Sequence, residues 1–210
     1  MMVKKIAAGI LAVALTGSLY AENYSEGQTF IGVELGSTEI DSSARLYSDG
    51  SFPIEVGEKS DSNIEYGFRL GAQNDEWRTT LLYTYYNDED SGYEDTMHKG
   101  SLNLDYFLWS TDAGGMQIKP FIGGHVGYMS YELTADTIEN LSLILADESG
   151  FFYGGQVGVA LAVAEMLEID LSYRYSFVDL DDISASGPDW YAESSLDNTG
   201  SIVLGLNYFF

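Results

Sequence analysis

The sequence predicts an all-β chain, an eight-stranded antiparallel up-and-down transmembrane β-barrel preceded by a cleaved signal peptide. Eight segments of about ten residues alternate between apolar and polar residues, which is the period of a strand with two different faces. The connections between these segments are alternately short and long. No apolar run reaches the ~18 residues expected of a membrane-crossing helix. We therefore expect one domain, residues 22–210, after a signal segment, residues 1–21.

The signal segment has the three parts of a secretory signal peptide. Lys4 and Lys5 form a basic start, residues 6–15 form a short apolar run, and Ala21 is a small residue before the expected cut. The apolar run is much shorter than the ~20 residues that cross a membrane, so a membrane-anchor helix is less favoured. The chain has no cysteine, which excludes a disulfide framework and a Cys metal site.

The apolar residues alone define the two faces of each of the eight predicted strands. The last segment is typical: Ile202, Leu204 and Leu206 share one face with the terminal aromatics, and small or polar residues lie between them. A tilted strand of about 9–11 residues crosses a bilayer. The predicted ranges are 28–38, 63–73, 77–87, 99–109, 118–129, 151–163, 168–177 and 200–210.

Charge separates the two faces of these strands, although charge did not enter the phasing. The apolar faces contain no Asp, Glu, Lys or Arg, because a charge facing lipid costs roughly 2–4 kcal/mol at mid-membrane. The opposite faces hold five acids and five bases, whose charges sum to zero: Glu34, Glu65, Asp105, Glu168, Asp170, Arg69, Arg78, Lys99, Lys119 and Arg174.

These inward charges predict a structural salt-bridge network inside the barrel. An eight-stranded barrel is just wide enough for side chains to fill it, and most other inward positions are Gly or small residues. A narrow ion path gated by one such pair is the functional alternative. The network is expected to rest on Glu34, Glu65, Arg69, Arg78, Asp105, Asp170 and Arg174.

The connections indicate how the barrel is oriented. Short periplasmic turns are expected at 74–76, 110–117 and 164–167, and long external loops at 39–62, 88–98, 130–150 and 178–198. The long loops hold 22 acids against only Arg45 and Lys59, which favours a solvated, self-repelling surface. Divalent cation binding at these acidic loops is the sharper alternative, with the best candidates at Asp179, Asp181 and Asp182.

Aromatic residues gather near both ends of the predicted strands, as expected for two girdles at the membrane interfaces. Trp109 and Phe121 are weaker members, because both fall in the inward phase. The group near the short turns comprises Trp77, Trp109, Phe121, Tyr208 and Phe210, and the group near the long loops comprises Tyr83, Tyr85, Tyr128, Tyr153, Tyr175 and Phe177.

Two strand motifs and the C-terminal aromatic carry a family resemblance. Lys119-Pro-Phe-Ile-Gly-Gly-His-Val-Gly-Tyr128, Leu171-Ser-Tyr-Arg-Tyr175 and terminal Phe210 resemble strands of small bacterial outer-membrane barrels, the OmpA-like transmembrane domain and opacity-type "porin family". The resemblance implies a monomer in the outer membrane of a Gram-negative bacterium, in contact with its lipid and lipopolysaccharide. It also implies that barrel-assembly machinery reads a C-terminal signal with Tyr208 and Phe210. The implied role is envelope integrity, surface interaction, or limited small-solute or ion passage.

Two other classes of function stay open. A lipid-modifying barrel enzyme would need a nucleophile beside His125, and the residues two and four positions later on the same face are Gly127 and Met129. We therefore expect no enzyme, no catalytic residue and no cofactor. A soluble lipocalin-like barrel would place its apolar residues inside. The net charge, −24 for the chain and −26 without Lys4 and Lys5, argues against a nucleic acid partner.

Overall fold

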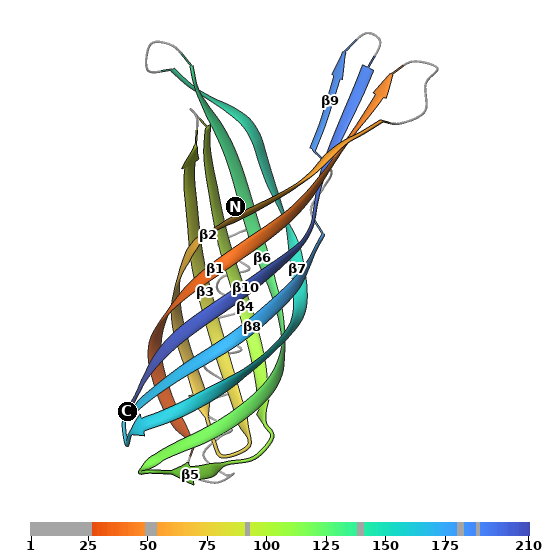
Figure 1. Ribbon diagram of the computed structural model, residues 1–210. Helices are drawn as coiled ribbons and strands as arrows, with labels where there is room; N and C mark the ends of the chain where they lie inside the picture. The colour runs from red at the N-terminus through yellow and green to blue at the C-terminus, as the bar shows by residue number, and fades with distance from the viewer. Residues whose placement is uncertain (1–26, 49–53, 91–92, 138–140, 180–182, 188–189) are drawn as a thin grey trace.

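The structure is a computed structural model that describes residues 27–48, 54–90, 93–137, 141–179, 183–187 and 190–210, so the predicted signal peptide lies outside it. Ten strands lie within these residues, and eight of them form the wall of a barrel (Figure 1). The wall strands are β1 (Gln28–Ser48), β2 (Ile54–Gln73), β3 (Trp77–Asp90), β4 (Tyr93–Phe107), β6 (Met116–Thr137), β7 (Leu141–Ala164), β8 (Leu167–Asp179) and β10 (Trp190–Phe209). The two short strands are β5 (Thr111–Ala113) and β9 (Ile183–Gly187).

The sheet closes on itself. Wall strands that follow one another in the sequence pair antiparallel, in the order β1-β2-β3-β4-β6-β7-β8-β10, and β1 also pairs with β10. In this closing pair Ile31 lies opposite Tyr208, and Leu35 lies opposite Leu204. Closure leaves no unpaired strand edge in the part of the wall that faces lipid, where no water could hydrogen-bond it. The prediction of an eight-stranded up-and-down barrel is confirmed.

The outer surface of the wall is apolar. Leu204, Tyr66 and Val33 are 52%, 57% and 54% exposed, whereas Glu34 and Arg69 on the opposite face are buried. None of the residues that the sequence assigns to the apolar face is buried. All ten predicted inward charges are buried. A lipocalin-like barrel would show the reverse pattern, so the soluble alternative is excluded.

The strands are longer than predicted on the side of the long connections. β1 reaches Ser48 instead of ending at residue 38, and β9 lies entirely within the loop expected at 178–198. Figure 1 shows the end of β1 and the start of β2 leaning away from the barrel together with β9 and the start of β10. The boundaries were misplaced because the apolar alternation stops where lipid stops, while the backbone pairing continues to Ser48 opposite Trp190.

The other end of the barrel carries the short turns. At 74–76 the side-chain oxygen of Asn74 accepts hydrogen bonds from the backbone N–H groups of Glu76 and Trp77, at 2.9 and 2.7 Å. The turn expected at 110–117 contains β5, and its two glycines at 114 and 115 take positive φ values of 63° and 89°. Phe210 N–H donates to Thr29 at 3.0 Å, so the first and last wall strands meet at this end.

The aromatic residues follow the two predicted groups, and Phe121 is the one predicted member that lies inside the barrel. The ring centres of Trp77 and Tyr106 lie 4.8 Å apart near the short turns, and those of Tyr153 and Phe177 lie 5.7 Å apart near the long connections. The prediction that Trp109 is in the inward phase is wrong: β4 ends at Phe107, and Trp109 is 60% exposed. Phe121 does point inward and is 1% exposed, so it belongs to the interior and not to a girdle.

Candidate functional site: the charged lumen

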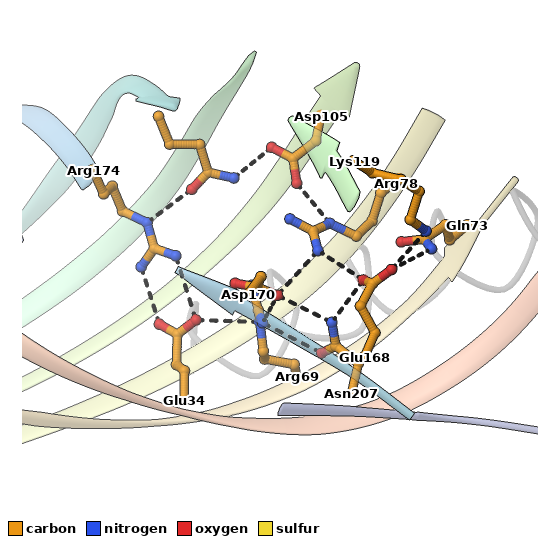
Figure 2. Close-up of polar contacts among 11 residues, drawn as sticks. Glu34, Arg69, Gln73, Arg78, Asp105, Lys119, Glu168, Asp170, Arg174 and Asn207 are labelled. Atoms are coloured by element: carbon orange, nitrogen blue, oxygen red, sulfur yellow. Dashed lines mark hydrogen bonds and ion pairs between the residues drawn. The ribbon is translucent and has the colours of Figure 1, made fainter. Parts of the chain in front are cut away.

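The barrel interior holds eleven polar side chains joined by ion pairs and hydrogen bonds, which we call the lumen network (Figure 2). Each member sits at an inward position of its strand, and together they come from all eight wall strands. Its members are Glu34, Arg69, Gln73, Arg78, Asp105, Lys119, Gln156, Glu168, Asp170, Arg174 and Asn207.

Asp170 on β8 is the centre of the lumen network. Its Oδ2 accepts hydrogen bonds from Arg69 Nη1 at 2.7 Å, Arg78 Nη1 at 3.1 Å and Asn207 Nδ2 at 3.1 Å. The side chain has no solvent exposure. One carboxylate therefore holds groups from β2, β3 and β10 together, across strands that do not all touch one another.

From Arg78 the contacts run around the lumen and return to Asp170. Arg78 Nε donates to Asp105 at 2.9 Å, and Asp105 accepts from Gln156 Nε2 at 2.5 Å. Gln156 Oε1 then accepts from Arg174 Nε at 3.1 Å.

Glu34 closes this path. Its two oxygens accept from the Nη atoms of Arg174 at 3.1 and 3.4 Å, and Glu34 Oε2 lies 3.2 Å from Arg69 Nε. Because Arg69 binds Asp170, the seven side chains form a closed ring, visible in Figure 2. A ring fixes each guanidinium against at least two acceptors, which satisfies buried charges that would be costly alone.

Glu168 extends the lumen network towards the short turns. It accepts from Lys119 Nζ at 2.6 Å and from Gln73 Nε2 at 3.0 Å, and it approaches Arg78 Nη1 at 3.4 Å. Towards the long connections, Lys99 forms a separate ion pair with Glu65. Thr38 donates to Glu65 at 3.1 Å and shares a hydrogen bond of 2.8 Å with Ser201.

Six of the seven charges singled out in the sequence meet in the ring: Glu34, Arg69, Arg78, Asp105, Asp170 and Arg174. Glu65 does not, since its partner is Lys99. The sequence reasoning missed the amides Gln73, Gln156 and Asn207, which link the charges. All three stand in the inward phase, so a search for every polar residue on that face, charged or neutral, would have found them.

Glycines on the wall make room for the long charged side chains. A Cβ at Gly205 would run into Arg69 Nη1, and a Cβ at Gly67 would run into Glu34 Cγ. The small inward residues noted in the sequence are therefore the spaces that their neighbours fill.

Bulky apolar residues also point inward, and of these the sequence analysis places only Phe121 and Met129 on the inward face. One cluster consists of Tyr86, Met97, Met129 and Phe152, and another of Phe107, Phe121 and Ala160. The second cluster lies against the cations of the lumen network: the guanidinium of Arg78 is 4.5 Å from the ring centre of Phe121, and Lys119 Nζ is 4.7 Å from that of Phe107. Such cation–π contacts contribute about 2 kcal/mol or more when desolvated.

The expectation that no serine shares the inward face near His125 is wrong. His125 Nε2 and Ser176 Oγ share a hydrogen bond of 2.8 Å, and both residues are buried. The serine comes from β8, two strands away, and β7 places only Gly154 between them. Counting along one strand could not show this contact, because it depends on the register of three strands.

The fold and the sequence agree with one known group of proteins. A family model described as "Outer membrane protein beta-barrel domain" matches residues 8–210. The chain belongs to this outer-membrane β-barrel family. No curated protein gave a match by sequence. Among the described residues, no helix is long and apolar enough to span a membrane.

Solved structures show the same barrel. The chain is similar to OprG from Pseudomonas aeruginosa, with a TM-score of 0.60 and 16% identity, covering 88% of this chain and 96% of that one. It is similar to Neisserial surface protein A, with a TM-score of 0.57 and 13% identity, covering 89% and 100%. A third is AlkL, determined in lipid bilayers, with a TM-score of 0.50, 14% identity and coverage of 90% and 92%. The family places this outer-membrane β-barrel protein in the outer membrane.

Proposed function

We propose that the chain is a non-conducting scaffold of the outer membrane, whose lumen is plugged by the lumen network. The observation that carries this proposal is the closed ring through Asp170, which joins side chains from opposite sides of the barrel. The five acids and five bases inside the barrel balance to zero. A balanced, mutually paired interior offers a passing ion no free counter-charge in exchange for its hydration shell.

The apolar clusters support the same role. Tyr86, Met97, Met129 and Phe152 are each at most 4% exposed, and Phe107 and Phe121 at most 3%. Bulky apolar side chains inside a narrow barrel exclude water, and an ion path needs water or substitute polar ligands. Limited ion passage remains the alternative, and it would require the ring of paired side chains to open.

We also propose that the chain is not an enzyme. The pair of His125 and Ser176 resembles part of a nucleophilic site, in which a third group orients the histidine. Here His125 Nδ1 is buried and has no hydrogen-bond partner among the described residues. The pair faces the lumen, away from the lipid that such an enzyme would modify, and a packing role for both residues accounts for their positions.

The external side is proposed to act through its charge. The long connections carry 22 acids and two bases, so they repel one another and anionic neighbours. Divalent cations would relieve this repulsion and bridge to lipopolysaccharide. Asp179 is exposed at the end of β8, whereas Asp181 and Asp182 lie outside the described residues. No group of three or more His, Cys, Asp or Glu in the described part of the chain could hold a metal ion.

Single-channel recording in planar bilayers tests the plug. We expect silence from the full chain, and steady events of defined size would overturn the proposal. Glu34→Gln, which neutralises one link of the ring, is expected to permit brief openings. The matched control is Asp112→Asn, a neutralised acid on exposed β5, which should stay silent. Steady events of the same size in both variants would show that the ring does not close the lumen.

A further inference from the structure

A cavity of about 290 Å³ opens at the short-turn end of the barrel, below the lumen network. We call it the vestibule, and it lies between the start of β1, the β2–β3 and β7–β8 turns, the start of β6 and the end of β10. Six of its lining residues carry the argument below: Gln73, Asp75, Lys119, Glu165, Glu168 and Phe209.

One buried hydrogen-bond acceptor in the inner wall of the vestibule has no donor among the described residues. Glu168 binds both Lys119 Nζ and Gln73 Nε2, so the one ammonium group that lines the vestibule among the described residues is already paired (Figure 2). Gln73 is 9% exposed, and its Oε1 accepts no hydrogen bond from any residue that the structure describes. A buried carbonyl oxygen without a donor is unfavourable, so this wall favours a ligand that brings a donor.

The charge of the vestibule selects the kind of donor. Its lining has three carboxylates, on Asp75, Glu165 and Glu168, and one ammonium, on Lys119, so it carries a net charge of −2. Asp75 and Glu165 are exposed and lie in the two turns at the rim. An anion would be repelled, and a neutral hydroxyl would leave the rim charges uncompensated. An organic ammonium ion meets both requirements, because it carries positive charge and three N–H donors.

We propose that the vestibule binds a small aliphatic diamine from the periplasmic side. One ammonium group donates to Gln73 Oε1, and the other lies between the carboxylates of Asp75 and Glu165. The methylene chain packs against apolar residues of the lining, among them Phe209. The site is a dead end if the lumen network is closed, but the binding itself does not depend on the plug proposed above.

Three ligands of equal length separate charge from shape. The full chain in lipid nanodiscs is titrated with 1,4-diaminobutane, 1,4-butanediol and succinate, and backbone amide shifts are followed by NMR. We expect saturable shifts at Gln73, Asp75 and Glu165 with the diamine only. Binding of the diol as tight as that of the diamine overturns the proposal. Diamine shifts confined to the acidic external side, without shifts in the vestibule, overturn it as well.

Variants of the rim test the assignment without disturbing the lumen network. Asp75→Asn combined with Glu165→Gln removes both rim charges in exposed turns, and we expect diamine affinity to fall about tenfold. Asp112→Asn removes an exposed acid at the same end of the barrel, on β5 and outside the vestibule, and should leave the affinity unchanged. An equal loss in both would show general attraction of cations to an acidic protein, which contradicts a defined site.

Discussion

Replacing Asp170 by Asn should destabilise the barrel more than any other single neutralisation of a lumen acid. The change keeps the shape of the side chain but removes the charge that Arg69 and Arg78 share. Each guanidinium loses a hydrogen bond to a charged acceptor, a contribution of about 1.5–3 kcal/mol. Arg69 keeps Glu34, and Arg78 keeps Asp105 and Glu168, so neither cation is left without a partner.

Together these two losses predict that the free energy of unfolding falls by about 3–6 kcal/mol. The assay is urea unfolding of the barrel in lipid vesicles, read from the mobility difference between folded and unfolded protein on unheated gels. Asp112→Asn, on the exposed β5, is the control and should stay within about 0.5 kcal/mol of the parent.

A double variant, Asp170→Asn with Arg69→Met, tests whether the effect comes from the pair. If it does, the double variant is more stable than the sum of the two single losses predicts, because both single changes remove the same Arg69–Asp170 ion pair and the double variant loses it only once. A loss below about 1 kcal/mol for Asp170→Asn would refute the reasoning, since it would mean that the charge is hydrated in the lumen and not held by the ring.

Three further predictions concern the wall and its end. Gly205→Ala should lower the free energy of unfolding by about 1–3 kcal/mol in vesicle unfolding, because the added Cβ would enter the space of Arg69. Gly100→Ala is the control and should lower it less, since no atom lies within 4 Å of that Cβ. Equal losses in the two variants would contradict this packing. Leu204→Lys places a charge on the lipid face and should cost about 2–4 kcal/mol in vesicle unfolding; no loss would contradict lipid contact there. Phe210→Ala should slow assembly by isolated barrel-assembly machinery in vesicles, measured as folded fraction against time, without changing equilibrium stability much; an unchanged rate would contradict the C-terminal signal.

The strand faces could be predicted from the sequence because lipid acts on every residue independently. A position that faces hydrocarbon excludes charge whatever its neighbours are, so Leu204 and Tyr66 could be assigned from local alternation alone. The outer ends of the strands could not be predicted in this way. Beyond the lipid both faces of a strand meet water, no alternation is imposed, and the pairing of Ser48 with Trp190 leaves no local pattern.

The contacts of the lumen were harder to predict because they depend on register across the barrel. The inward direction of Arg78 follows from its own strand, but its three carboxylate partners lie on β4 and β8. The contact between His125 and Ser176 likewise depends on Gly154 of the strand between them. The alternation along one strand predicts which face a side chain is on. It does not predict which side chains of other strands lie at the same height in the barrel.

Whether an arginine or a lysine stands at a given height in the lumen follows from the number of hydrogen-bond acceptors around it. Arg69, Arg78 and Arg174 are the three bases of the ring, and each meets acceptors from at least two residues. Lys99 and Lys119 stand on either side of the ring, and each forms its ion pair with one carboxylate. A guanidinium offers five N–H donors in a rigid plane and can hold several strands at once, whereas an ammonium is a single compact charge. The arginines therefore join the strands of the barrel, and each lysine balances one acid beside the ring, Glu168 for Lys119 and Glu65 for Lys99.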